Sequence, residues 1–219
     1  MPDHVSRPET LVFRPGSGSF EEVVSTYHNP NHLMYKKMKC VFEHVRPGGT
    51  LIDVGCGIGE FIIQLQGHFH SLLGIDISPH EIEFAKKRLG KYENVFLSCG
   101  ELESFHFPDE HFDVCLCLDV LEHVPTVFPL LQEIYRILRN DGDLIVTVPN
   151  WYDIIVSKFL NKNPQHVNTL TPWHWMAILK KAGFKISIYR AIDYPLIHSD
   201  YLSKRIPIFG MCILIIAFK

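Results

Sequence analysis

Residues 50–59 read Thr-Leu-Ile-Asp-Val-Gly-Cys-Gly-Ile-Gly, and this stretch decides the fold. The apolar run at its start has the length of a buried strand and carries one acid, Asp53. Three glycines follow, Gly55, Gly57 and Gly59, and the residues after them have the apolar spacing of a helix. The stretch therefore predicts a strand, a tight glycine turn and a helix whose N-terminus exposes bare backbone, where a ligand can approach.

Outward from this turn, apolar strand patterns alternate with helical patterns. The expected strands are residues 50–54, 71–77, 95–98, 112–118, 143–148, 184–189 and 208–218. Helical patterns fall at residues 34–45, 61–65, 79–89, 125–138 and 172–182. Such alternation predicts an α/β fold, a Rossmann-like, doubly wound and mostly parallel seven-stranded sheet. The last two strands have no helix between them, which indicates an antiparallel C-terminal hairpin at one edge.

Length and composition restrict the class of protein. A chain of 219 residues suits one α/β domain, expected over residues 21–219 after an N-terminal arm at 1–20. The net charge of -3 argues against a nucleic-acid substrate. Six cysteines form no CxxC pair, so we expect no disulfide and no zinc, and a reducing, cytoplasmic compartment. The apolar run at residues 206–218 is too short for a membrane span, so we expect a strand there.

A second strand end supports a nucleoside ligand. The run Leu73-Gly74-Ile75-Asp76-Ile77 places an acid 21 positions after Gly55. At this spacing the Asp76 carboxylate can accept both hydroxyls of a ribose that lies across the first two strand ends. The alternative is that Asp76 is a solvated acid before a helix.

The residues after Asp76 predict the start of that helix. Ser78 is the expected N-cap and Pro79 the first helical residue, with Glu81 as the capping-box partner. Ile77 and Ile82 have the spacing of a hydrophobic staple.

The glycine spacing separates two classes of nucleoside cofactor. Turns that bind dinucleotides usually read GxGxxG, whereas this turn reads GxGxG and has Glu60 in place of the third glycine. The spacing disfavours a nicotinamide cofactor. A tight loop without any ligand is the other alternative.

Three motifs together resemble the class I methyltransferases that depend on S-adenosylmethionine (SAM), especially the type of ubiquinone and menaquinone biosynthesis. They are DVGCGIG at 53–59, GIDIS at 74–78 and CGELESFHFPDEHFDVCLCLDVLEHV at 99–124. The resemblance implies SAM as cofactor and S-adenosylhomocysteine as product. It also implies the binding residues Asp53, Gly55, Cys56, Gly57, Gly59, Asp76, Ile77, Glu101, Leu102, Leu118 and Asp119. Glu101 would face the adenine amino group, unless it and Glu103 are only exposed loop acids.

The acceptor side is expected after the fourth strand. His123 and His166 are the candidate bases for removing a proton from an acceptor, although His123 could equally be a structural histidine. A magnesium ion between Asp119 and Asn150 is a variant that we disfavour, because Pro149 stands where a second carboxylate would be needed. We therefore expect no metal.

The sequence thus predicts an enzyme that methylates a small molecule, with oxygen favoured over nitrogen or carbon. Two other functions stay open: a nicotinamide-dependent reductase on a Rossmann-like fold, and a non-catalytic protein that binds a partner through this fold. The acceptor and the oligomeric state are not determined by the sequence.

Overall fold

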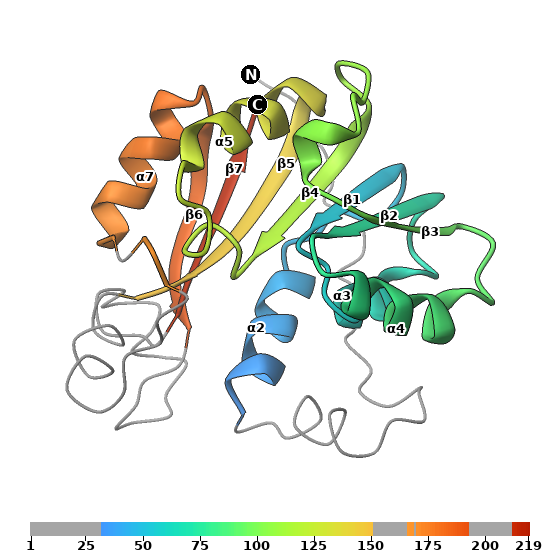
Figure 1. Ribbon diagram of the computed structural model, residues 1–219. Coiled ribbons are helices and arrows are strands. Elements are labelled where there is room, and N and C mark those ends of the chain that lie inside the picture. The colour runs from blue at the N-terminus through green and yellow to red at the C-terminus, as the bar shows by residue number, and fades with distance from the viewer. Residues whose placement is uncertain (1–31, 151–165, 169, 193–211) are drawn as a thin grey trace, which may run out of the picture.

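The computed structural model describes residues 32–150, 166–168, 170–192 and 212–219 (Figure 1). The helices are α2 (Leu33–Phe42), α3 (Glu60–Leu65), α4 (Pro79–Leu89), the short 3-10 turn η1 (Leu102–Ser104), α5 (Val127–Ile137) and α7 (Pro172–Lys181). The strands are β1 (Thr50–Val54), β2 (Ser71–Asp76), β3 (Val95–Cys99), β4 (Phe112–Leu118), β5 (Leu138–Pro149), β6 (Lys185–Ile192) and β7 (Cys212–Phe218). The arm expected at 1–20 lies outside the described residues.

All seven strands form one sheet in the order β3-β2-β1-β4-β5-β7-β6. The five strands from β3 to β5 are parallel, while β7 pairs antiparallel with both β5 and β6. The expected fold class and the antiparallel C-terminal pair are confirmed. From β1 the chain builds outward to β3 and then returns to place β4 on the other side of β1. In open α/β sheets such a switch point leaves a crevice at the carboxyl ends of the two central strands.

Helices cover both faces of the sheet, which explains the nearly continuous apolar strands. Figure 1 shows α5 and α7 on one face and α2, α3 and α4 on the other. Along β4, Cys115 and Cys117 belong to the core beneath α5 and α7, whereas Val114 and Leu116 belong to the opposite core. Because successive side chains of a strand point to opposite faces, a strand covered on both sides must be apolar throughout.

Several element boundaries differ from the sequence-based expectation, and the difference at the start of β5 is the largest. The strand β5 begins at Leu138, five residues before the expected start at Asp143, because Leu138 already pairs with Phe112. A register shift between Phe112 and Val114 accommodates the extra residues. The strand β7 lies between β5 and β6, so β6 is the edge strand of the hairpin.

The described part of the chain contains no helix that is both long and apolar enough to cross a membrane. All six cysteines are free; Cys99 is exposed and the other five are buried.

Close packing of α3 on β2 requires glycine at position 74. A Cβ atom there would lie 2.5 Å from Ile62 Cδ1, 2.8 Å from Cys56 Sγ and 2.8 Å from Leu97 Cδ2. The side chains of the helix and the neighbouring strand therefore fill the space that any other residue would need.

Replacing Gly74 by alanine should lower the free energy of unfolding by about 1 to 3 kcal/mol, because the added methyl group overpacks this contact. The matched control is Gly67→Ala, where a Cβ atom meets nothing within 4 Å. Its effect should stay within about 0.5 kcal/mol. Chemical denaturation measures both, and equal stability of the two variants would contradict the packing argument.

Candidate functional site

A cavity of about 420 Å³ lies at the switch point, a size within the range of small-molecule sites. It is lined by Met34, Lys37, Asp53, Gly55, Cys56, Gly57, Ile58, Glu60, Phe61, Glu81, Leu118, Asp119 and Thr147. Four of these residues are acids and one is a lysine. The cavity therefore favours a ligand that carries positive charge.

Each of the three glycines in the turn after β1 is required for a different structural reason. All three have positive φ, at 76°, 50° and 80° for Gly55, Gly57 and Gly59. A Cβ at Gly55 would lie 2.3 Å from Val120 Cγ2, and one at Gly59 would lie 2.4 Å from Leu89 Cδ1. At Gly57 the nearest atom would be 3.9 Å away, so this glycine leaves the cavity wall bare. Of the three, Gly57 leaves the most room for a ligand.

Asp76 ties the glycine turn to the end of β2. Its Oδ2 accepts a hydrogen bond of 2.9 Å from the Gly57 amide, and its Oδ1 accepts one of 2.9 Å from the Ser78 amide. A carboxylate offers about four lone-pair positions, so each oxygen can still accept from a ligand hydroxyl. Asp76 is thus a structural tether that keeps capacity for a ribose.

The start of α4 differs in part from the expected capping box. Ser78 is the N-cap, and its Oγ accepts from the Glu81 amide at 3.3 Å, as predicted. The amide of Ser78, however, donates to Asp76 rather than to the Glu81 side chain. The predicted hydrophobic staple between Ile77 and Ile82 is also wrong, because Ile82 is buried while Ile77 is 73% exposed.

Exposed Ile77 belongs to an open shelf beside the cavity. The Gly100 amide donates to the Asp76 carbonyl at 2.9 Å, which holds the loop after β3 against the end of β2. In that loop Glu101 is exposed and Leu102 is 2% exposed. The shelf offers an apolar surface between two acids, Asp76 and Glu101.

Asp53 is the acid most deeply buried at the cavity. Its side chain is 2% exposed, and its Oδ2 has no hydrogen-bond partner among the described residues. Burial, and after it the charge of Asp76, raises the pKa of Asp53 to about 7. An ionised carboxylate here needs a positive ligand group for compensation.

Lys37 of α2 is a site residue that the sequence analysis missed. It is 7% exposed, and its Nζ bonds to Asp119 Oδ2, while Asp119 Oδ1 accepts from Thr147 Oγ1 at 3.0 Å. Burial acts to lower the pKa of Lys37, but the surrounding acidic groups, Asp119 among them, raise it overall. A signal existed in the sequence, since Lys37 interrupts the apolar stripe of Met34, Met38 and Val41.

The same pair bears on the magnesium variant between Asp119 and Asn150. The Asp119 carboxylate already has Lys37 as its positive partner and Thr147 as a donor. Asn150 is fully buried. This arrangement gives the variant no support.

The two expected bases, His123 and His166, come together although they lie far apart in the sequence. Their ring centroids are 5.0 Å apart in an edge-to-face arrangement. The contact is held by the Glu122 carbonyl, which accepts from the amides of Val167 and Asn168 at 2.9 and 3.0 Å. His123 is exposed and His166 is half-buried, and neither lines the cavity.

Glu122 lies beneath this pair of histidines. Its side chain is 2% exposed, and Oε2 has no hydrogen-bond partner in the described part of the chain. Burial, followed by the charge of Asp119, raises the pKa of Glu122 to about 8.

The cavity therefore collects about half of the predicted binding residues. Those that line it are Asp53, Gly55, Cys56, Gly57, Leu118 and Asp119. The other five predicted residues, Gly59, Asp76, Ile77, Glu101 and Leu102, do not line it. Sequence reasoning missed Met34, Lys37, Ile58, Glu60, Phe61, Glu81 and Thr147. Of these, Glu60 forms an ion pair of 2.7 Å with Arg88.

The raised pKa of Asp53 predicts a pH-dependent stability. The unfolded chain loses this proton near the ordinary value of 3.8, whereas the folded chain keeps it until about pH 7. The free energy of unfolding should therefore fall by up to about 4 kcal/mol as the pH rises between these values, and stay level above. Asp53→Asn, which has no proton to lose, should show a smaller fall in denaturation curves measured from pH 4 to 8.

Glu83→Gln, on the exposed side of α4, is the control for removal of an acid. Its pH profile should match the wild type. Identical pH profiles for Asp53→Asn and the wild type would contradict the raised pKa of the buried Asp53.

Comparisons with known proteins agree with this geometry. Residues 52–146 match the family model of the methyltransferase domain. An uncharacterised methyltransferase of Bacillus subtilis, YcgJ, is 27% identical over 78% of this chain and 69% of its own length. A demethylmenaquinone methyltransferase of Staphylococcus saprophyticus is 26% identical over 66% of this chain, which covers 64% of that relative.

A solved structure shares the fold. The SAM-dependent methyltransferase of Mesorhizobium loti superposes with a TM-score of 0.67 at 18% identity, over 85% of this chain and 98% of that one. The domain match, the curated relatives and the glycine turn at the switch point lead to one conclusion: residues 52–146 resemble the methyltransferase domain in sequence, and the chain shares the fold of SAM-dependent methyltransferases.

Proposed function

We propose that this protein transfers the methyl group of SAM to a small-molecule acceptor, with oxygen as the favoured methylated atom. The observation that carries the proposal is the buried Asp53 carboxylate, whose Oδ2 has no partner among the described residues, in the wall of a cavity beside the bare backbone of Gly57. The methionine end of SAM carries an ammonium, a sulfonium and one carboxylate, so its net charge is positive. An acid-lined cavity of this size suits its methionine end.

The shelf beside the cavity suits the nucleoside end. Asp76 would accept the ribose hydroxyls with its remaining lone pairs. Exposed Ile77 would cover one face of the adenine, with Glu101 near its amino group and the Leu102 amide near its ring. Burying Ile77 under a base would also account for a large apolar side chain left in solvent.

The remaining predicted residues would shape the cavity around the methionine end. Gly55, Cys56 and Gly57 form one wall, and Leu118 and Asp119 form the wall at the end of β4. Gly59 would act indirectly, as the left-handed N-cap that starts α3.

The acidic residues and the cavity itself each disfavour one of the two alternative functions. A dinucleotide would bring a pyrophosphate to the glycine turn, where Asp53, Glu60 and Glu81 line the cavity and would repel it. A non-catalytic protein that binds a partner would have no need for a cavity of about 420 Å³ at the switch point. Both alternatives therefore explain fewer of the observations.

SAM, when bound, supplies a methyl group that already carries its leaving group. The protein then needs to align the acceptor with the sulfur–methyl bond and keep water out. His123 and His166 lie together after the end of β4, and either imidazole would take the proton of an acceptor hydroxyl. This pair is why an oxygen acceptor is favoured. A demethylated quinone, the acceptor named for the Staphylococcus relative, is a second acceptor to assay.

SAM and S-adenosylhomocysteine should both bind with micromolar affinity, and NAD should bind far more weakly, because only the former two bring an ammonium group to Asp53. Titration calorimetry measures the three dissociation constants. Tighter binding of NAD than of SAM would overturn the methyltransferase proposal.

Asp76→Ala should weaken SAM binding about tenfold to a hundredfold, because hydrogen bonds to a charged acceptor are worth about 1.5 to 3 kcal/mol. The variant also frees the Gly57 and Ser78 amides, so a control for local loosening is needed. Ser78→Ala removes the cap of α4, at a cost of about 1 kcal/mol in stability, and leaves the Asp76 carboxylate in place. Equal losses of SAM affinity in both variants would assign Asp76 to structure alone.

A further inference from the structure

Glu122, His123 and His166 place three metal-binding groups in one spot. One carboxylate oxygen and one ring nitrogen of each histidine all lie within 4.8 Å of one another. The groups come from two chain segments, which the hydrogen bonds from Val167 and Asn168 to the Glu122 carbonyl fix against each other. This spot adjoins the cavity, since Asp119 lines the cavity and its charge acts on Glu122.

A second observation points to a ligand here. Glu122 is 2% exposed, and its Oε2 lacks a hydrogen-bond partner in the described parts of the chain. The nearby cation, Lys37, is already paired with Asp119. A buried carboxylate in this position is satisfied by a positive ligand.

We propose that Glu122, His123 and His166 form a binding site for a divalent first-row transition-metal ion. Two imidazoles and one carboxylate suit Mn²⁺ to Zn²⁺ better than they suit Mg²⁺, which prefers oxygen ligands. Ligand distances of about 2.0 to 2.2 Å require the three atoms to approach one another to roughly 3 to 3.5 Å. The exposed side chain of His123 can supply this movement.

Three protein ligands leave open positions on such an ion. We infer, resting on the proposed function, that an acceptor hydroxyl occupies one of them and loses its proton to solvent. The oxygen lone pair then forms the bond to the methyl carbon, and the electron pair of the broken carbon–sulfur bond stays on sulfur as a neutral thioether. In this arrangement His123 and His166 promote loss of the acceptor proton by holding the ion, which replaces the direct proton transfer to an imidazole described under the proposed function. This reverses the sequence-based expectation that the protein has no metal site.

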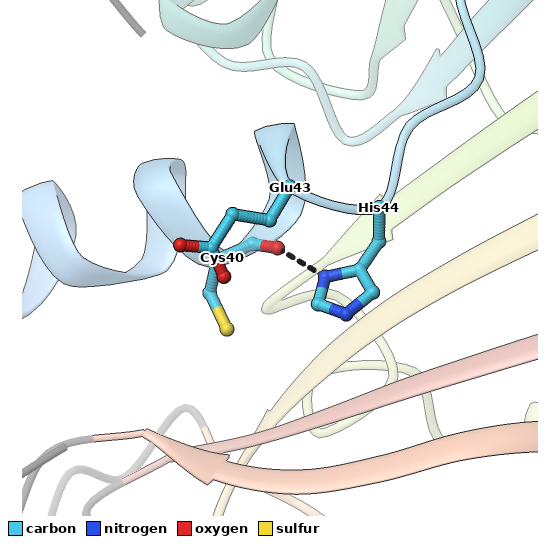
Figure 2. A group of neighbouring side chains, drawn as sticks. All are labelled: Cys40, Glu43 and His44. Carbon is cyan, nitrogen blue, oxygen red and sulfur yellow. Dashed lines mark hydrogen bonds between the residues drawn. The ribbon is translucent and has the colours of Figure 1, made fainter. Parts of the chain in front are cut away.

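A second group of three metal-binding side chains provides the comparison. Cys40, Glu43 and His44 also have ligand atoms within 4.8 Å of one another, at the C-terminal end of α2 (Figure 2). Here Nδ1 of His44 is 2.7 Å from the Cys40 carbonyl, and Glu43 is paired with Arg190 at 3.1 Å. These contacts explain the group as the end of a helix, so it serves as a control and not as a site.

Co²⁺ titrated into the full-length protein, followed by its visible absorption, tests the proposal. We expect saturation at about one Co²⁺ per chain and displacement of the Co²⁺ by Zn²⁺. His123→Ala and His166→Ala should each weaken Co²⁺ binding by about tenfold or more, as should Glu122→Gln. His44→Ala is the matched control, since it removes an imidazole from the comparison group, and it should leave Co²⁺ affinity unchanged.

The proposal is overturned if the wild type shows no saturable Co²⁺ binding, or if His123→Ala and His166→Ala bind Co²⁺ as tightly as the wild type. It is also overturned if only His44→Ala loses the ion. Circular dichroism of each variant excludes unfolding as the cause of a loss. Calorimetry with SAM on the same samples separates the two proposals: SAM binding without Co²⁺ binding rejects only the metal site, and the reverse rejects only the methyltransferase assignment.

Discussion

A cluster of buried acidic side chains near the carboxyl ends of β1 and β4 is the constraint on which the site depends. Two acids have positive partners within the fold: Asp119 pairs with Lys37, and Glu60 with Arg88. Two others, Asp53 and Glu122, are equally buried, and an oxygen of each lacks a hydrogen-bond partner among the described residues. Since ionising a buried acid without a partner is costly, these two carboxyl groups are the places where we propose positive ligands.

The Lys37–Asp119 ion pair determines which of the neighbouring acids remain available to a ligand. Asp53 belongs to the strand whose end opens into the glycine turn, and Glu122 belongs to the segment that carries His123. A lysine paired to Asp119 keeps that acid from serving either ligand. The pair thus separates the proposed cofactor half of the site from the proposed acceptor half.

Local patterns were sufficient to predict the backbone around the glycine turn. The turn from Gly55 to Gly59, the acid at Asp76 and the cap at Ser78 each depend on residues close in the sequence, and short-range geometry fixes their backbone. The parallel sheet followed from the alternation of strands and helices for the same reason. The position of β7 between β5 and β6 needed the tertiary structure, because an antiparallel strand can join a sheet at several places.

The acceptor half could not be predicted to the same extent. Lys37 reaches the site because α2 packs on the sheet against β6 and β7, and His166 reaches His123 because two amides donate to the Glu122 carbonyl. Both are long-range contacts that no local spacing encodes. The sequence identified the two histidines singly, as candidate bases, but not their adjacency or the carboxylate beneath them.

The places where sequence rules failed are themselves informative. The staple at Ile77 fails because that side chain stays in solvent on the shelf, where an adenine would cover it. Asp119, directly after β4, has a φ of 55°, which is uncommon for a residue other than glycine. This left-handed turn ends the strand and lets the Asp119 carboxylate line the cavity while the chain continues toward Glu122 and His123. Such local costs persist where function requires them, and here the unfavourable backbone lies where the two halves of the site meet.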